Sequence, residues 1–120
     1  MVTPRRRRGM ERLTVGDIVL VRFPFSDLTA KKYRPALVVA EAELGDIIVC
    51  QITSKSYGKK NIIKIARRDL SGGSLPVESF ARPDKLFTLS NQLVARKIGK
   101  ISNEKIEETK VRLAQIFGLG

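Results

Sequence analysis

Apolar residues form three short runs in the first half of the chain, and each run has the length of one β-strand. The predicted strands are residues 13–23, 35–41 and 47–53. A polar loop at 24–34 separates the first two strands, and Gly45-Asp46 makes the turn before the third. Because almost every position in these runs is apolar, we expect both faces of the strands to be buried in a small β-barrel.

The pattern of the second half indicates further short strands. Ile62–Ile65 is a predicted fourth strand, and Leu70–Ser74 is a predicted loop because it holds two glycines and two serines. Pro76–Phe80 and Lys85–Leu89 are predicted as two short strands. The expected fold is therefore mainly β.

One amphipathic helix is predicted at the C-terminal end. Ser102 is a good N-cap, and Gly118 lies where a helix-ending glycine is favoured. The apolar face of this helix carries Ile106, Leu113, Ile116 and Phe117. Such a face packs against its own barrel in most cases and serves a partner in fewer.

The net charge of the chain indicates which class of partner the protein binds. Lysine and arginine outnumber acidic residues 23 to 12 over 120 residues, which gives a net charge of +11. Four of the positive charges are Arg5 to Arg8, but the rest of the chain is also basic. A basic domain favours an anionic partner, most often nucleic acid. The alternative is that the charge only aids solubility.

Composition divides the chain into two parts. Residues 1–12 read as a disordered basic arm, and residues 13–120 read as one globular domain. The arm adds non-specific affinity for phosphate or is a solvated tail. No apolar run has transmembrane length, and the basic N-terminus is not followed by the apolar segment of a signal peptide. We therefore expect a cytoplasmic protein with no membrane partner.

Residue types that many active sites require are missing. The chain has no histidine, and its single cysteine, Cys50, lies inside an apolar run, where it reads as a small buried hydrophobe. There is no glycine-rich phosphate loop, and the acidic residues are too scattered for a two-metal nuclease site. We therefore expect no metal and no cofactor, which leaves a metal-independent reaction.

RNA permits such a reaction because its own 2′-hydroxyl can attack the adjacent phosphate. The protein then has to align the attacking oxygen and stabilise the added negative charge. The planar, permanently charged guanidinium of Arg34 suits two phosphate oxygens, and the Thr53 hydroxyl suits a further hydrogen bond. An antiparallel pairing of their strands would place both residues at one edge of the sheet. The alternatives are a surface arginine before a proline and a threonine that makes a local turn bond.

The chain resembles the PemK/MazF toxins of type II toxin–antitoxin systems over residues 13–117. The resemblance is carried by Gly16–Leu28 with its Phe23-Pro24-Phe25, by Lys32–Val39 with its Arg34-Pro35, by Gln51–Lys55, and by Ser79–Leu89 followed by Arg96–Gly99. It implies a small SH3-like β-barrel of the CcdB/PemK type with a C-terminal helix. It also implies a homodimer that cuts single-stranded RNA at short sequences without metal, leaving a 2′,3′-cyclic phosphate and a 5′-hydroxyl. The implied protein partner is an antitoxin that is acidic in its C-terminal segment.

The resemblance also implies the site residues. The catalytic arginine of the family corresponds to Arg34, and the catalytic threonine corresponds to Thr53. Removing the proton of an arginine at neutral pH is costly, which argues against Arg34 as the base. We favour Arg34 as a charge clamp and as a proton donor to the leaving oxygen, with water or a substrate oxygen accepting the 2′ proton. The predicted RNA contacts are Phe25, Lys31, Lys32, Ser54, Lys55, Ser79 and Arg82. Phe25 would stack on a base or, alternatively, anchor its loop in the core.

Two other classes of function stay open at this point. A gyrase-poisoning toxin of the CcdB type would share the fold and act by binding protein, but the Arg34 and Thr53 pair and the basic charge argue against it. A non-catalytic barrel would bind RNA with a steep salt dependence and leave it intact.

Overall fold

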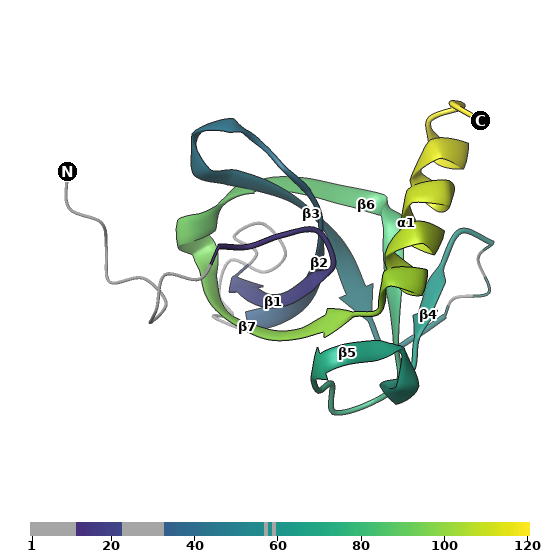
Figure 1. Ribbon diagram of the computed structural model, residues 1–120, viewed down its shortest axis with the longest axis horizontal. Helices are drawn as coiled ribbons and strands as arrows, with labels where there is room; N and C mark the ends of the chain where they lie inside the picture. Colours follow the sequence, from purple (N-terminus) through teal and green to yellow (C-terminus); the bar gives the residue numbers. More distant parts are fainter. Residues whose placement is uncertain (1–11, 23–32, 57, 59) are drawn as a thin grey trace.

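The computed structural model describes residues 12–22, 33–56, 58 and 60–120 (Figure 1). The predicted basic arm lies outside the described residues except for Arg12. Three of the predicted RNA contacts, Phe25, Lys31 and Lys32, also lie outside them.

Seven antiparallel strands of the described residues form one sheet, in the order β4-β6-β3-β2-β1-β7-β5. The strands are β1 (Asp17–Arg22), β2 (Tyr33–Glu41), β3 (Asp46–Thr53), β4 (Ile63–Ile65), β5 (Leu70–Gly73), β6 (Ser79–Ser90) and β7 (Val94–Ile101). Short 3₁₀ turns are η2 (Glu43–Gly45), η3 (Arg67–Asp69) and η4 (Asn91–Leu93). The sheet curls into a half-barrel, and helix α1 (Asn103–Ile116) packs against β6 and β4 (Figure 1). This confirms the predicted barrel with a C-terminal helix.

Both faces of the central strands are buried, as the continuous apolar runs predicted. Because successive side chains of a strand point to opposite faces, Val21 and Val49 belong to one core cluster, whereas Leu37 and Ile52 belong to the other. Cys50 lies fully buried in the second cluster, and this burial raises the pKa of its thiol to about 12. The prediction that Cys50 is a small core residue is confirmed.

The predicted loop at Leu70–Ser74 is wrong, because most of it forms β5. This strand pairs with β7, where Gly72 lies opposite Lys100 and Gly73 lies opposite Gly99. Gly73 has a φ angle of +74°, and a Cβ atom at this position would overlap the backbone of β7. The glycines that suggested a loop therefore allow the backbones of β5 and β7 to lie close together.

The two short strands predicted between Pro76 and Leu89 are also wrong, because β6 is one strand of 12 residues. Its register with β3 shifts between two neighbouring positions: Gln51 pairs with Arg82, but Cys50 pairs with Leu86. The three residues 83–85 therefore bulge out of the ladder. Pro83 lies in this bulge, where its missing N–H is tolerated.

The sequence pattern predicted no strand over β7. The charged residues of this segment interrupt the alternation of apolar and polar positions that indicates a strand. Two of these residues, Lys97 and Lys100, point back to Asp17 of β1, and their Nζ atoms lie 3.3 Å and 3.5 Å from Asp17 Oδ1. Asp17 is fully buried and also accepts a hydrogen bond from the Thr14 backbone N–H at 2.8 Å. These paired charges fasten β7 to β1.

Helix α1 is capped as predicted at both ends. The Ser102 Oγ accepts a hydrogen bond from the Lys105 backbone N–H at 3.3 Å, and Gly118 has a φ angle of +72° just beyond the last turn. Ile106 packs against the second core cluster, whereas Phe117 is 59% exposed. The predicted apolar face therefore only partly reaches the barrel. None of the helices in the described residues has the length and apolar character needed to cross a membrane.

Candidate functional site

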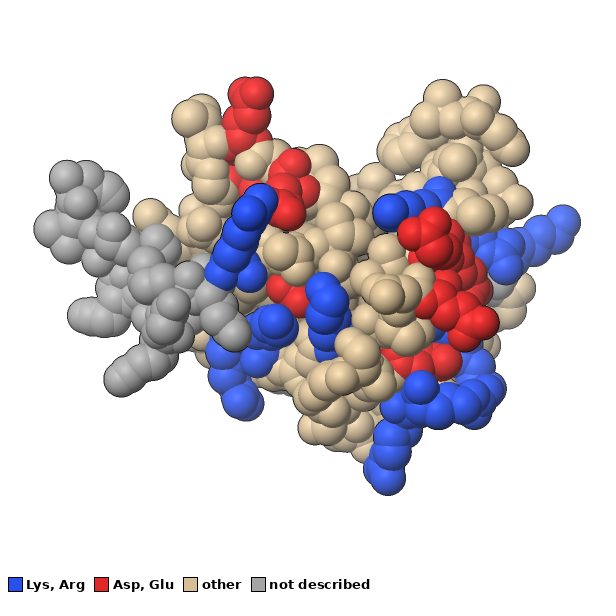
Figure 2. All heavy atoms as spheres, in the orientation of Figure 1, with Lys and Arg blue, Asp and Glu red and all other residues tan. Residues whose placement is uncertain are grey.

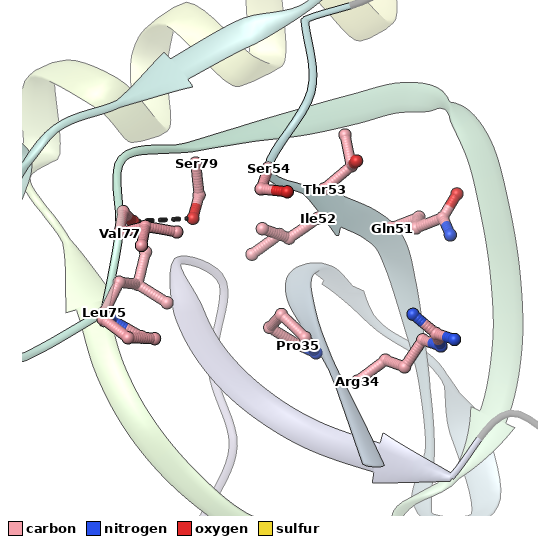
Figure 3. Close-up of a pocket in the computed structure, with 10 residues that line it drawn as sticks. Arg34, Pro35, Gln51, Ile52, Thr53, Ser54, Leu75, Val77 and Ser79 are labelled. Carbon is pink, nitrogen blue, oxygen red and sulfur yellow. Dashed lines mark hydrogen bonds between the residues drawn. The ribbon is translucent and has the colours of Figure 1, made fainter. Parts of the chain in front are cut away.

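The strand register brings Arg34 and Thr53 to the same place. Ala36 of β2 lies opposite Gln51 of β3, and Arg34 and Thr53 each lie two residues beyond this pair, toward the same end. Because the side chains of a strand alternate, Arg34 and Thr53 share one face of the sheet. Both residues line one open pocket of about 300 Å³ (Figure 3). The predicted proximity of the two residues is therefore present in the structure.

Polar and apolar residues are separated in this pocket. Arg34, Gln51 and Thr53 lie on one side of the view in Figure 3, and Leu75 and Val77 lie on the other. Pro35 and Ile52, the direct neighbours of Arg34 and Thr53, point to the apolar side because strand residues alternate. The remaining lining residues are Ser54, Pro76 and Ser79. A polar row beside an apolar wall suits a ligand that has both a charged group and a flat apolar part.

Arg34 offers a free positive charge at the mouth of the pocket. Its backbone is held by β1, where it pairs with Val21, and its side chain is exposed. Within the part of the chain that the structure describes, no carboxylate forms an ion pair with Arg34. A guanidinium in this state can give parallel hydrogen bonds to two oxygens of an anion.

Thr53 ends β3 with its hydroxyl held in place. Its Oγ1 accepts a hydrogen bond from the Lys55 backbone N–H at 3.2 Å, which is the local turn bond that the sequence left as an alternative. On the other side, β3 pairs with β6, where Thr53 lies opposite Phe80. Because the hydroxyl accepts from Lys55, its own proton remains available for a ligand.

The other residues predicted near the pocket differ in their positions. Ser54 and Ser79 line it, but Ser79 is buried and its Oγ donates to the Val77 backbone oxygen at 2.9 Å, so it shapes the wall. Lys55 is exposed and is not among the lining residues. Its backbone, rather than its side chain, connects it to Thr53.

Arg82 does not line the pocket, although it lies on the neighbouring strand opposite Gln51. Its Nη2 and Nε donate to the two carboxylate oxygens of Asp84, at 3.0 Å and 3.3 Å. The side chain of Arg82 is only 12% exposed. The structure therefore places Arg82 next to the polar row on the neighbouring strand, with its charge balanced by Asp84.

Sequence reasoning missed two parts of the pocket. Gln51 lies on the same face as Thr53, two residues earlier, and the alternation of β3 would have been enough to find it. Leu75, Pro76 and Val77 come from the connection between β5 and β6, which lies far from β3 in the sequence. No local pattern shows that this connection folds over the start of β2 and the end of β3.

Basic side chains gather on the face of the molecule that carries β7 (Figure 2). Acidic side chains lie near the turn between β2 and β3 and beside α1, where basic side chains flank them. The basic residues of β7 are Arg96, Lys97 and Lys100. Among the described residues, no group of three or more His, Cys, Asp or Glu side chains could hold a metal ion.

Comparisons with known proteins indicate a family and a fold. The family model of PemK-like, MazF-like toxins of type II toxin–antitoxin systems matches residues 14–117. No curated protein sequence matches the chain significantly.

Solved structures that resemble this one include the following three. A mycobacterial endoribonuclease in complex with its cognate antitoxin has a TM-score of 0.73 at 14% identity, over 91% of this chain and 98% of its own. The Mycobacterium tuberculosis toxin MazF-mt6 has a TM-score of 0.69 at 18% identity, over 87% and 98% of the two chains. A chain of MazE-MazF from Deinococcus radiodurans has a TM-score of 0.70 at 18% identity, over 90% and 97%. At these identities the matches show a shared fold.

Proposed function

Because the chain belongs to the PemK-like, MazF-like toxins of type II toxin–antitoxin systems, we propose that it is an endoribonuclease that cleaves single-stranded RNA at specific sequences and without a metal ion. Members of this family are typically endoribonucleases. The observation that carries the proposal is that Arg34 and Thr53 line one open pocket from adjacent strands. The polar row with its apolar wall suits the phosphate and base of one nucleotide.

The proposed reaction uses a nucleophile from the substrate. The ribose 2′-oxygen forms a bond to the adjacent phosphorus while the bond from phosphorus to the 5′-oxygen breaks. The products are a 2′,3′-cyclic phosphate and a 5′-hydroxyl, so no water is consumed. The 2′ proton passes to water or to a substrate oxygen, and the leaving 5′-oxygen gains a proton.

Arg34 and Thr53 have different tasks in this scheme. The guanidinium of Arg34 binds two phosphate oxygens and stabilises the charge that grows on them in the transition state. The fixed hydroxyl of Thr53 donates to a non-bridging oxygen. Arg34 also donates a proton to the leaving 5′-oxygen and then takes a proton from water, which restores the guanidinium.

We also propose two protein partners, a second copy of the chain and an acidic antitoxin. The net charge of +11 and the basic face over β7 support an acidic partner, because opposite charges steer association (Figure 2). One of the similar structures is an endoribonuclease bound to its cognate antitoxin. Sedimentation of the purified protein at micromolar concentration tests the dimer, and a monomer there would exclude it.

Cleavage of a short RNA in excess EDTA tests the proposed function. The wild-type protein should cut, and Arg34→Ala should cut about 10²-fold more slowly or worse, because the transition-state charge loses its main counter-charge. Arg112→Ala on α1 is the matched control and should keep wild-type activity. Replacing the 2′-hydroxyl at the cut site with hydrogen should abolish cutting there. Activity that requires magnesium, or inhibition of gyrase without RNA cleavage, would contradict the proposal.

A further inference from the structure

Gln51 is the one residue of the polar row without a task in the proposed reaction. Its side chain is half-buried and lines the pocket from β3, the strand that also carries Thr53 (Figure 3). Among the described residues, no side chain or backbone group forms a hydrogen bond with its carboxamide. A partly buried amide of this kind gains free energy when a ligand supplies the missing bonds.

The position of Gln51 separates it from the reacting phosphate. It lies two residues before Thr53 on the same strand, which puts the two Cα atoms about 7 Å apart. This distance exceeds the width of a phosphate group that is held between Arg34 and Thr53. Gln51 therefore faces the part of the nucleotide that leads away from the phosphate, and the apolar wall that a flat base would contact lies across the pocket from it (Figure 3).

The chemistry of the carboxamide favours a base over the backbone. A phosphate offers only acceptors, which would leave the carbonyl oxygen of Gln51 unsatisfied. The edge of an unpaired base sets a donor beside an acceptor, and a carboxamide matches that arrangement with two hydrogen bonds. A base without the right arrangement would leave both groups unbonded, which is a strong basis for discrimination.

We propose that Gln51 is a specificity-determining residue that reads the edge of one unpaired nucleobase next to the cleaved bond. This inference rests on the proposed function, because it assigns a subsite within the same pocket. It goes beyond that function by naming the residue that selects the sequence and the part of the substrate that this residue contacts.

Cleavage of RNA that is randomised around the cut site, with sequencing of the fragment ends, tests the role of Gln51. Gln51→Leu keeps most of the side-chain volume and removes the hydrogen bonds, and Gln51→Glu keeps acceptors only. Preference for one base at one position next to the cut should fall by about tenfold or more in Gln51→Leu. Gln51→Glu should shift preference toward bases that present donors. Gln115→Leu, on the exposed side of α1, is the matched control and should keep the wild-type profile.

The outcomes separate this inference from the proposed function. A loss of rate that is equal for all sequences would mean that Gln51 holds the backbone, and an unchanged profile would mean that it does not contact the substrate. Either result overturns the inference and leaves the nuclease in place. If the wild type cuts no RNA, the proposed function fails. Binding of 2′-deoxy-substituted oligonucleotides to the wild type and to Gln51→Glu then tests base reading without turnover, and equal preferences would overturn the inference.

Discussion

The hydroxyl of Thr53 shows how a single residue can be held ready for a ligand. Its oxygen accepts from the Lys55 backbone N–H, so the rotation of the hydroxyl proton is biased toward the remaining directions. An ordinary strand-end turn bond therefore orients a donor in the candidate site.

Replacing Thr53 separates the hydroxyl from the shape of the side chain. Thr53→Val keeps the volume and removes the donor, and we expect its cleavage rate to fall by about 10²-fold with little change in substrate affinity. Thr53→Ser keeps the hydroxyl and should stay within about tenfold of wild type. Single-turnover kinetics measure both, with melting temperatures to show that the variants fold. Equal rates for the valine variant and the wild type would remove Thr53 from the reaction.

The proximity of Arg34 and Thr53 could be predicted from the sequence because it follows from strand order. An arginine at the start of one apolar run and a threonine at the end of the next meet in any antiparallel pair. Gln51 could have been found from the same alternation. Arg82 could not be placed, since its position opposite Gln51 depends on the bulge at residues 83–85.

At the scale of elements, the pocket depends on the connection between β5 and β6, which lies next to the central strands β2 and β3. The connection between them supplies Leu75, Pro76 and Val77 to the apolar wall. β5 is anchored on β7 through glycines, so its stability rests on a close contact between two backbones.

Gly73→Ala tests this contact. Its added Cβ would overlap the Ile98 carbonyl oxygen and would also occupy a backbone conformation with positive φ. We expect a loss of about 3 kcal/mol or more in the free energy of unfolding, or local detachment of β5. Gly118→Ala is the matched control, because it has a φ angle of +72° with open space around it and should lose only about 1 kcal/mol.

Urea unfolding measures both glycine variants, and hydrogen exchange of the β5 amides detects local detachment. Equal losses for the two variants would show that the close approach of β5 to β7 does not matter. The sequence did not reveal this contact, because glycine has the same local signature in a loop and in a tightly packed strand.

At the scale of the whole molecule, the charge is arranged unevenly. Basic side chains gather over β7, whereas beside α1 they are mixed with acidic ones, so the face over β7 is the side that suits a polyanion (Figure 2). The net charge follows from the sequence alone. The distribution of the charged residues over the surface could not be predicted, because β7 was not predicted as a strand.

The salt dependence of RNA binding tests the role of this charge. If about four phosphates are bound, the logarithm of the binding constant should fall against the logarithm of salt concentration with a slope of about −3. Fluorescence anisotropy with an RNA that carries 2′-hydrogen at the cut site measures this slope without cleavage. An affinity that stays constant between about 50 and 200 mM salt would show that phosphate contacts do not drive binding.

The chemical ends of the RNA fragments test the central claim most directly. The claim is that the substrate's own 2′-oxygen attacks while Arg34 and Thr53 stabilise the charge. Mass spectrometry of the fragments made in EDTA should show a 2′,3′-cyclic phosphate on one fragment and a 5′-hydroxyl on the other. A 5′-phosphate with a free 3′-hydroxyl would mean that water attacked the phosphate, and the proposed mechanism would be wrong.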